Sequence, residues 1–176
     1  MALKVLIVID MQKDFVDGSL GTKEAQAIVP AVVEKVRHFD GRILFTKDTH
    51  YGNYKETQEG RKLPVPHCIK GTGGWELVPE LEAFCREHHC QVLEKNSFGS
   101  LSLATNLQLM NEQEPLESIE LAGLCTDICV VSNALLVKAA LPDMPVLVDS
   151  RCCAGVTPAS HEAALTVLRS CQVEVL

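Results

Sequence analysis

Long apolar runs and basic clusters are both missing from this sequence. No stretch approaches the ~18 consecutive apolar residues that a membrane-spanning helix needs, and the apolar run at residues 5–9 is too short for the core of a signal peptide. The formal net charge is −7 and Lys and Arg form no run, so the chain offers no basic surface to nucleic acid or to an anionic membrane. We therefore expect a cytoplasmic protein with neither kind of partner.

Repeats, low-complexity tracts and domain linkers are missing as well. A length of 176 residues suits one domain with one sizeable core, so we expect residues 1–176 to form a single domain. Eight cysteines in a chain of this length are too sparse for a disulfide-stapled scaffold. Several of them lie on apolar segments, which favours free thiols in a reducing compartment.

Apolar runs rich in Val, Ile and Leu alternate with helical patterns along the chain. The runs are continuous, which is typical of strands that are covered on both faces. The predicted strands are residues 3–9, 42–47, 90–94, 118–122, 145–149 and 172–176. The predicted helices are residues 24–39, 79–88, 101–110, 126–141 and 159–170, with Pro30 either kinking the first helix or marking its true first turn. This alternation predicts a three-layer α/β/α fold with a six-stranded, mostly parallel sheet.

One segment, residues 49–74, interrupts the alternation. It has no convincing periodicity and is rich in glycine and proline. Loops of this length inside a compact domain are usually functional. Because the segment follows the second predicted strand, we expect it to form an active-site loop over the carboxyl end of the sheet, where open α/β sheets bind ligands.

Three reactive side chains follow predicted strands at the same edge. Asp10 follows the first strand, Lys95 the third, and Cys129 the fourth, near the start of a helix. A helix N-terminus and a nearby cation both lower the pKa of a thiol. Cys129 is therefore a candidate nucleophile, with Asp10 as its base and Lys95 as the partner of the thiolate. Backbone N–H groups between Cys125 and Cys129 could form an oxyanion hole.

Each of these residues also has a plain structural interpretation. Asp10 could cap a strand end, Lys95 could be solvated, and Cys129 could belong to the core. Cys125 and Cys129 could instead share a metal, although no partner pair at zinc-finger spacing supports this.

A second set of candidates follows the second strand. Asp48 and His50 point to the same side of an extended segment, and His67 comes later in the loop, after two prolines. Imidazole and carboxylate ligands with open positions suit Zn²⁺, Fe²⁺ or Mn²⁺, so we expect one divalent transition metal. The alternative is that Asp48 caps the loop while both histidines contact only solvent.

Five segments together resemble the isochorismatase-like cysteine hydrolases. They occur in family order and at family spacing over essentially the whole chain: VIDMQKDF (8–15), TKDTH (46–50), PHCIKGT (66–72), EKNSFGS (94–100) and GLCTDICVV (123–131). The resemblance implies a Rossmann-like sheet of six parallel strands between helices. It also implies that Asp10, Lys95 and Cys129 form the catalytic triad, with backbone N–H groups of Cys125 and Cys129 in the oxyanion hole. A cis peptide between Leu124 and Cys125 is a further family feature.

Within this family the chain is most similar to the nicotinamidases, which carry the same D-x-H…H pattern. This similarity implies metal ligands at Asp48, His50 and His67, a fourth acidic ligand at Glu59, and Phe15 packed on the substrate ring.

The resemblance implies hydrolysis of nicotinamide to nicotinate and ammonia through a Cys129 thioester, within NAD salvage. Aromatic residues of some nicotinamidases are replaced here by the segment 63–65 and by Ile128, which leaves the exact amide open. One alternative is a metal-independent hydrolase of a carbamoyl or ureido amide, and another is a catalytically silent binding or scaffold protein. Isochorismate hydrolysis is not expected, because family members with that activity lack the nucleophilic cysteine. Whether the chain forms a homo-oligomer is open.

Overall fold

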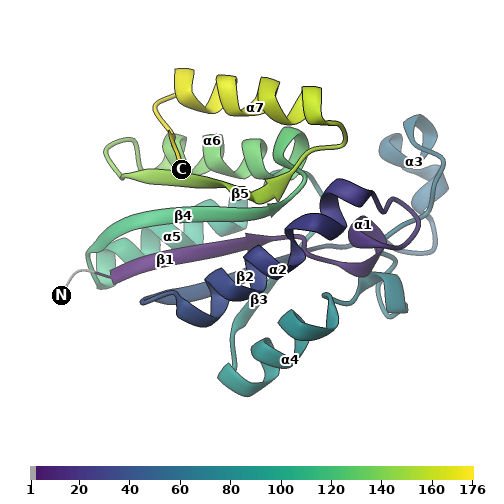
Figure 1. The fold of residues 1–176 in the computed structure, drawn as a ribbon, viewed down its shortest axis with the longest axis horizontal. Helices are drawn as coiled ribbons and strands as arrows, with labels where there is room; N and C mark the ends of the chain where they lie inside the picture. Colours follow the sequence, from purple (N-terminus) through teal and green to yellow (C-terminus); the bar gives the residue numbers. More distant parts are fainter. Residues whose placement is uncertain (1–2) are drawn as a thin grey trace.

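The computed structural model describes residues 3–176 and is built around one parallel sheet. The six strands lie in the order β3-β2-β1-β4-β5-β6, and every neighbouring pair is parallel. The strands are β1 (Leu3–Ile9), β2 (Arg42–Asp48), β3 (Gln91–Lys95), β4 (Leu116–Leu124), β5 (Val146–Ala154) and β6 (Glu174–Val175). The predicted fold class is therefore confirmed (Figure 1).

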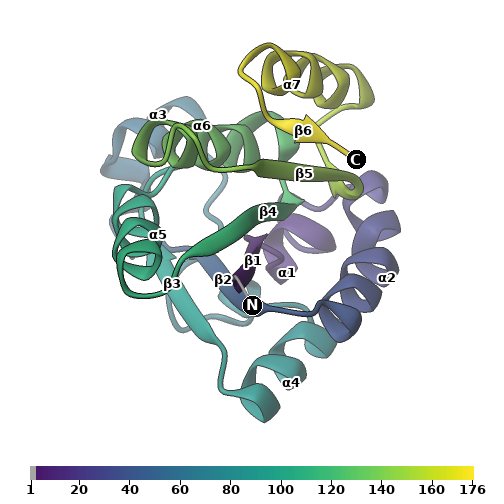
Figure 2. The same cartoon turned by 90° about the vertical axis from the view of Figure 1, so that its left-hand side faces the viewer.

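Helices cover both faces of the sheet. One face carries α2 (Lys23–His38) and α4 (Pro79–His88), and the other carries α5 (Leu101–Gln113), α6 (Val131–Ala140) and α7 (Pro158–Ser170). Figure 2 shows α5 and α6 on one side of the strands and α2 and α4 on the other. In the part of the chain that the structure describes, no helix combines the length and the apolarity that crossing a bilayer requires.

The central strand explains why its apolar run is continuous. Residues 5–9 of β1 are completely buried. Val5, Ile7 and Ile9 pack into the core beneath α5, α6 and α7, whereas Leu6 and Val8 pack into the core beneath α2 and α4. Side chains of a strand alternate between its two faces, so a strand with a core on each side needs apolar residues at every position.

Several predicted boundaries differ from the structure. β4 and β5 continue beyond their apolar runs, because they pair again after a register shift between Leu121 and Gly123. β6 is only two residues long, since it pairs with β5 at the edge of the sheet over two positions. The helix predicted from residue 126 is divided into a π-helix, η3 (Thr126–Val130), and α6. Pro30 lies inside α2, which begins at Lys23, so its interpretation as the first turn is wrong.

The segment 49–74 lies at the carboxyl edge of the sheet and contains short elements. These are η1 (Tyr54–Glu56), α3 (Gln58–Lys62) and the start of η2 (Gly73–Trp75). In Figure 1, α3 and α1 (Lys13–Val16) lie on the side toward which the strand arrows point. α3 has no apolar periodicity because Gly60 is its only buried residue, which is why the sequence pattern did not predict it.

Candidate active site

Asp10, Lys95 and Cys129, here called the triad, meet at the carboxyl edge of the sheet. Asp10 directly follows β1, Lys95 ends β3, and Cys129 lies in η3 after β4. The Lys95 Nζ atom is 2.6 Å from Asp10 Oδ2 and 3.5 Å from Cys129 Sγ. None of the three residues is more than 5% exposed, so water screens their charges only weakly. The structure thus brings together the three side chains that the sequence singled out.

Asp10 is fixed by Thr46, a buried residue of β2. The Thr46 hydroxyl donates to Asp10 Oδ1 at 2.6 Å and accepts from the Asp10 N–H at 3.2 Å. The Asp10 backbone has φ 47°, in the left-handed region that Asp tolerates better than most residues. Burial raises the pKa of Asp10, while the positive charge of Lys95 opposes the rise. Asp10 is therefore a preoriented carboxylate that accepts a proton more readily than an exposed one.

Lys95 is surrounded by acceptors. Beyond its two triad partners, its ammonium lies 3.5 Å from Asp48 Oδ1 and donates to the Ser97 carbonyl at 3.1 Å. Burial favours the neutral amine, but the charges of Asp10, Cys129 and Asp48 outweigh burial and raise the pKa of Lys95. Lys95 is therefore a constant cation at the centre of the site.

Cys129 does not have the lowered pKa that the sequence suggested. Burial raises the pKa of its thiol well above the usual value, and the Asp10 carboxylate adds to the rise while Lys95 opposes it. The prediction was wrong because desolvation outweighs one cation. The thiolate must form together with transfer of its proton.

The turn that precedes Cys129 has a distinctive backbone. The peptide between Leu124 and Cys125 is cis, in agreement with the family feature. Gly123 has φ 119°, and a Cβ atom there would lie 2.1 Å from the Ile9 carbonyl oxygen. Only glycine allows the turn to approach the end of β1 so closely.

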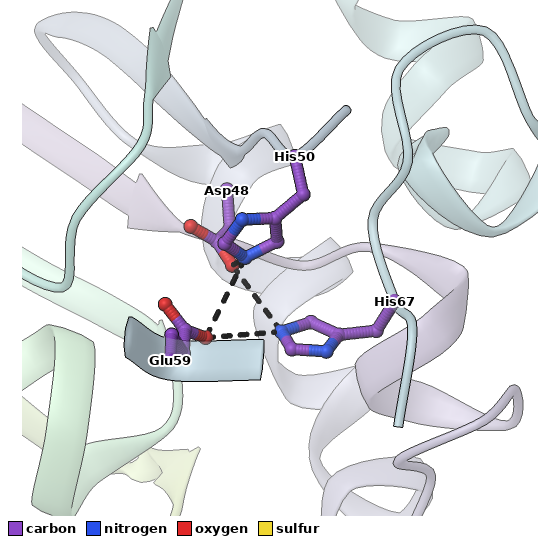
Figure 3. Close-up of side chains that lie close together, drawn as sticks. All are labelled: Asp48, His50, Glu59 and His67. Atoms are coloured by element: carbon purple, nitrogen blue, oxygen red, sulfur yellow. Dashed lines mark hydrogen bonds and ion pairs between the residues drawn. The ribbon is translucent and has the colours of Figure 1, made fainter. Parts of the chain in front are cut away.

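Asp48, His50, Glu59 and His67, here called the metal group, point toward one another (Figure 3). The group lies beside the triad, since Asp48 contacts Lys95. Their ligand atoms all lie within 4.8 Å of one another. His50 Nε2 is 3.0 Å from Asp48 Oδ2 and 3.5 Å from Glu59 Oε1. His67 Nε2 is 3.6 Å from Asp48 Oδ2 and 3.5 Å from Glu59 Oε1. Among residues 3–176 this is the one such group of three or more residues, so a shared metal at Cys125 and Cys129 gains no support.

The metal group fits a small divalent ion. Ligands bound at ~2.0–2.2 Å to a tetrahedral Zn²⁺ lie roughly 3.3 Å apart. The four histidine–carboxylate separations of 3.0–3.6 Å are close to this value, and all ligand atoms of the group lie within 4.8 Å of one another. His67 Nδ1 lies 2.8 Å from the Val65 carbonyl oxygen, so Nδ1 donates there and Nε2 is left to bind a metal. Two imidazoles and two carboxylates suit Zn²⁺, Fe²⁺ and Mn²⁺.

The carboxylates of the metal group raise the pKa values of its two histidines. Burial disfavours charged His50, but hydrogen bonds to Asp48 and Glu59 outweigh burial and raise its pKa to about 9. The same balance raises the pKa of His67 to about 10. Hydrogen bonds from the two histidines lower the pKa of Glu59 to about 2. Because a metal needs an unprotonated imidazole nitrogen, metal binding must displace these protons.

Gln12 supports the metal group and was missed by sequence reasoning. Its side chain donates to the Asp48 carbonyl at 2.8 Å and accepts from the Asp48 N–H at 2.7 Å. It also donates to the Trp75 carbonyl at 2.9 Å. Gln12 therefore ties the end of β2 to the far end of the loop. The signal was present, since Gln12 belongs to the D-x-Q segment.

Two further residues of the site carry no local signal in the sequence. Tyr54 packs edge-on against His50 and His67, with ring centroids 4.8 and 5.1 Å away. His161, on α7, contacts the buried Thr126 hydroxyl at 2.8 Å and so supports the turn before Cys129. The contact of His161 with Thr126 joins residues 35 positions apart, and the ring contacts of Tyr54 lie within an aperiodic loop, so periodicity reveals neither.

A cavity of about 640 Å³ extends from Cys129 of the triad to the metal group. Asp48, Glu59 and His67 line one part, and Cys125 and Cys129 line another. The rest of the wall is largely apolar and includes Phe15, Leu63, Phe98, Ile128 and Val156. The Phe15 ring lies 5.4 Å from the His67 ring. A larger concavity of about 730 Å³ lies at the amino edge of the sheet, but none of the candidate residues lines it.

Curated relatives cover almost the whole chain. The isochorismatase family protein PncA of Bacillus subtilis is 31% identical over 173 residues, which span 93% of this chain and 92% of the relative. The nicotinamidase/pyrazinamidase of Mycobacterium tuberculosis is 28% identical, over 99% of this chain and 98% of its own. A relative in Arabidopsis thaliana, 27% identical over 96% and 89% of the two chains, is described as a probable inactive nicotinamidase.

Solved structures share the fold over the same length. The nicotinamidase/pyrazinamidase PncA of Bacillus subtilis superposes with a TM-score of 0.86 at 28% identity, covering 99% of both chains. The pyrazinamidase of Pyrococcus horikoshii, solved in complex with zinc, gives a TM-score of 0.79 at 26% identity, covering 98% of both chains. The predicted resemblance to nicotinamidases, and with it the prediction of a hydrolase acting on amide bonds, is confirmed.

The family description "Isochorismatase domain" matches residues 4–176. The match spans nearly the whole chain, and the 31% identity to the relative from Bacillus subtilis supports the same assignment. The chain therefore belongs to the isochorismatase family.

Proposed function

We propose that the protein hydrolyses nicotinamide to nicotinate and ammonia. The observation that carries this proposal is that Cys129 lines the same cavity as Asp48, Glu59 and His67, three members of the metal group. A nucleophile can then attack a carboxamide whose ring nitrogen is directed to the metal group. The names of the relatives, nicotinamidase and pyrazinamidase, support an amide of a nitrogen heteroaromatic ring as the substrate.

In the proposed reaction the triad first forms the nucleophile. Asp10 accepts the Cys129 proton, and the Lys95 ammonium stabilises the resulting thiolate. The thiolate attacks the amide carbonyl carbon, forming a C–S bond and placing negative charge on the carbonyl oxygen. Backbone N–H groups of Cys125 and Cys129 stabilise that oxyanion.

Three proton transfers at Asp10 complete the cycle. Protonated Asp10 gives its proton to the amide nitrogen as the C–N bond breaks, so ammonia leaves and a thioester remains on Cys129. Asp10 then removes a proton from water, whose oxygen attacks the thioester carbon. The C–S bond breaks, the acid is released, and the proton returns to Cys129.

Asp48, His50, Glu59 and His67 would hold one divalent transition metal, with Zn²⁺, Fe²⁺ and Mn²⁺ all compatible with the donor set. Such an ion would supply an electrophilic site for the ring nitrogen and so orient the carboxamide. Phe15 packs beside His67 and would contact the ring. The Pyrococcus horikoshii pyrazinamidase was solved in complex with zinc, which supports a bound metal in this protein.

We place the reaction in the cytoplasm as a step of NAD salvage, with a small amide as the only partner required. All eight cysteines are free thiols, which suits a reducing compartment.

The test is ammonia release across a panel of amides. Protein purified without an affinity tag and loaded with Zn²⁺, Fe²⁺ or Mn²⁺ is given nicotinamide, pyrazinamide, benzamide, and carbamoyl and ureido amides. We expect the two heteroaromatic amides to be preferred, with benzamide poor because it lacks a ring nitrogen. Preference for ureido amides without metal would favour the alternative hydrolase. No activity on any amide would favour a silent member, as described for the Arabidopsis relative.

A further inference from the structure

Asn133, on α6, is completely buried and connects two walls of the cavity. Its Nδ2 donates to the Phe98 carbonyl at 3.0 Å and to the Cys129 carbonyl at 2.8 Å. Its Oδ1 accepts from the Ser100 N–H at 2.9 Å. Both amide protons and the carbonyl oxygen are therefore engaged with backbone groups, on the nucleophile's own turn and on residues 96–100.

The segment 96–100 belongs to the site. The Ser97 carbonyl accepts from the Lys95 ammonium at 3.1 Å, and Phe98 lines the cavity although the residue is 47% exposed. Ser100 caps α5 by accepting from the Leu103 N–H at 3.1 Å, which anchors the end of the segment. An exposed aromatic residue next to a glycine provides little packing to hold the middle, so hydrogen bonds must do so.

An asparagine suits this place for electrostatic reasons. Two backbone carbonyls and one backbone N–H need two donors and one acceptor, which one primary amide supplies. The amide is neutral and adds no charge near Lys95 and Cys129. Bonding to the carbonyl four residues earlier in the helix fixes one N–H, and the other N–H then faces the segment 96–100.

We propose that Asn133 is a positioning residue for the hydrolysis proposed above. It ties the segment 96–100 to the Cys129 turn, and thereby fixes both the Lys95 ammonium and the Phe98 wall relative to the nucleophile. The positioning role rests on the proposed function. The hydrogen-bonded connection between the segment 96–100 and the Cys129 turn, here called the tie, does not, and it is measured separately.

The tie is tested without substrate. Asn133→Ala removes all three hydrogen bonds, and Asn133→Asp keeps the size and the acceptor but loses the two N–H donors. Asn111→Ala is the matched control, because Asn111 Oδ1 accepts from the Leu116 N–H at 2.9 Å and does not line the cavity. We expect amide hydrogen exchange in residues 96–100, and tryptic cleavage after Lys95, to be about tenfold faster in both Asn133 variants. In the control both rates should match the wild type.

Kinetics test the consequence for the reaction. A displacement on the order of 1 Å can cost ~10²-fold in rate, so we expect kcat/KM to fall at least about tenfold in both Asn133 variants, with kcat itself reduced. A purely structural role would lower the unfolding temperature and leave kcat and KM of the folded enzyme unchanged, which would overturn the proposal. Unchanged exchange in residues 96–100 would overturn it equally. If Asn133→Ala does not fold, the exchange and kinetic measurements on Asn133→Asp test the proposal. Absence of amide hydrolysis in the wild type would refute the proposed function instead, and the exchange comparison would still decide the tie.

Discussion

Cys129 of the triad lines the same cavity as Asp48, Glu59 and His67 of the metal group, but the two groups are supported by different parts of the chain. The triad residues end strands or lie in the turn after β4, and they are almost completely buried. In the metal group only Asp48 belongs to a strand, whereas Glu59 and His67 come from the segment 49–74. The Glu59 side chain is 22% exposed.

Under the proposed function, this difference separates the residues of the reaction from those that orient the substrate. Parallel strands fix the triad through backbone hydrogen bonds and two packed cores, so its geometry does not depend on the loop. The metal group needs the loop to return to the end of β2, which Gln12 promotes by bonding both Asp48 and Trp75. Changes in the metal group should therefore leave the nucleophile reactive, while changes in the triad should leave metal binding intact.

The largest effect is expected from Cys129→Ala. Loss of a nucleophile typically lowers turnover by ~10⁴-fold or more, and we expect that loss here with one bound metal per chain retained. Cys125→Ala is the matched control, since Cys125 is proposed to act through its backbone and should keep most activity. Ammonia release and elemental analysis measure the two properties. Comparable activity in Cys129→Ala and the wild type would exclude a thioester on this residue.

Asp10→Asn and Lys95→Met should have the next largest effects. Asp10→Asn preserves shape but removes the base, and Lys95→Met preserves much of the stem but removes the charge. Proton transfer by a placed side chain contributes ~10²–10⁴-fold, so we expect turnover to fall at least ~10²-fold in each variant. Alkylation of Cys129 by iodoacetamide should also slow, because the thiolate loses its proton acceptor or its counter-ion. Near-normal turnover in either variant would remove that residue from the mechanism.

A smaller and different effect is expected from His67→Ala. The variant should lose the metal and bind substrate poorly, with KM raised about tenfold or more, while Cys129 is alkylated at the wild-type rate. His38→Ala is the control, because His38 is an exposed histidine that pairs with Glu34 and should change neither property. Slower alkylation of Cys129 in His67→Ala would show that the two groups are not independent.

The fold was predictable because the hydrophobic core on each face of the sheet requires apolar residues that can be recognised in the sequence. A central strand such as β1 must be apolar at every position, and the continuous apolar runs in the sequence indicated such strands. Strand ends were less predictable. β5 continues through polar residues to Ala154 because pairing with β4 resumes after a register shift, which depends on a neighbouring strand rather than on local pattern.

The positions of the site residues were predictable, but their environment was not. Asp10 and Lys95 follow strand ends, and parallel strands bring such ends to one edge. The direction of the Cys129 pKa was wrong, because burial is a tertiary property that outweighs the cation visible in the sequence. Thr46 and Asn133 were missed for the same reason, since a polar residue inside an apolar element reveals its role only through distant partners.

The smallest expected effect is the release of protons when a metal binds, which tests the electrostatics of the metal group. The pKa of His50 is about 9 and that of His67 about 10, so at pH 7.5 both imidazoles carry a proton in the metal-free protein. Zn²⁺ requires unprotonated nitrogens, so its binding should release about two protons per chain, and apparent affinity should rise with pH until about pH 10. Isothermal titration calorimetry in buffers with different ionisation enthalpies measures this number. Glu59→Gln removes one of the two carboxylates that raise both pKa values, so fewer protons should be released at the same pH. Release of no protons by the wild type would mean that both histidines are already neutral, and that the carboxylates do not control the metal group as the geometry indicates.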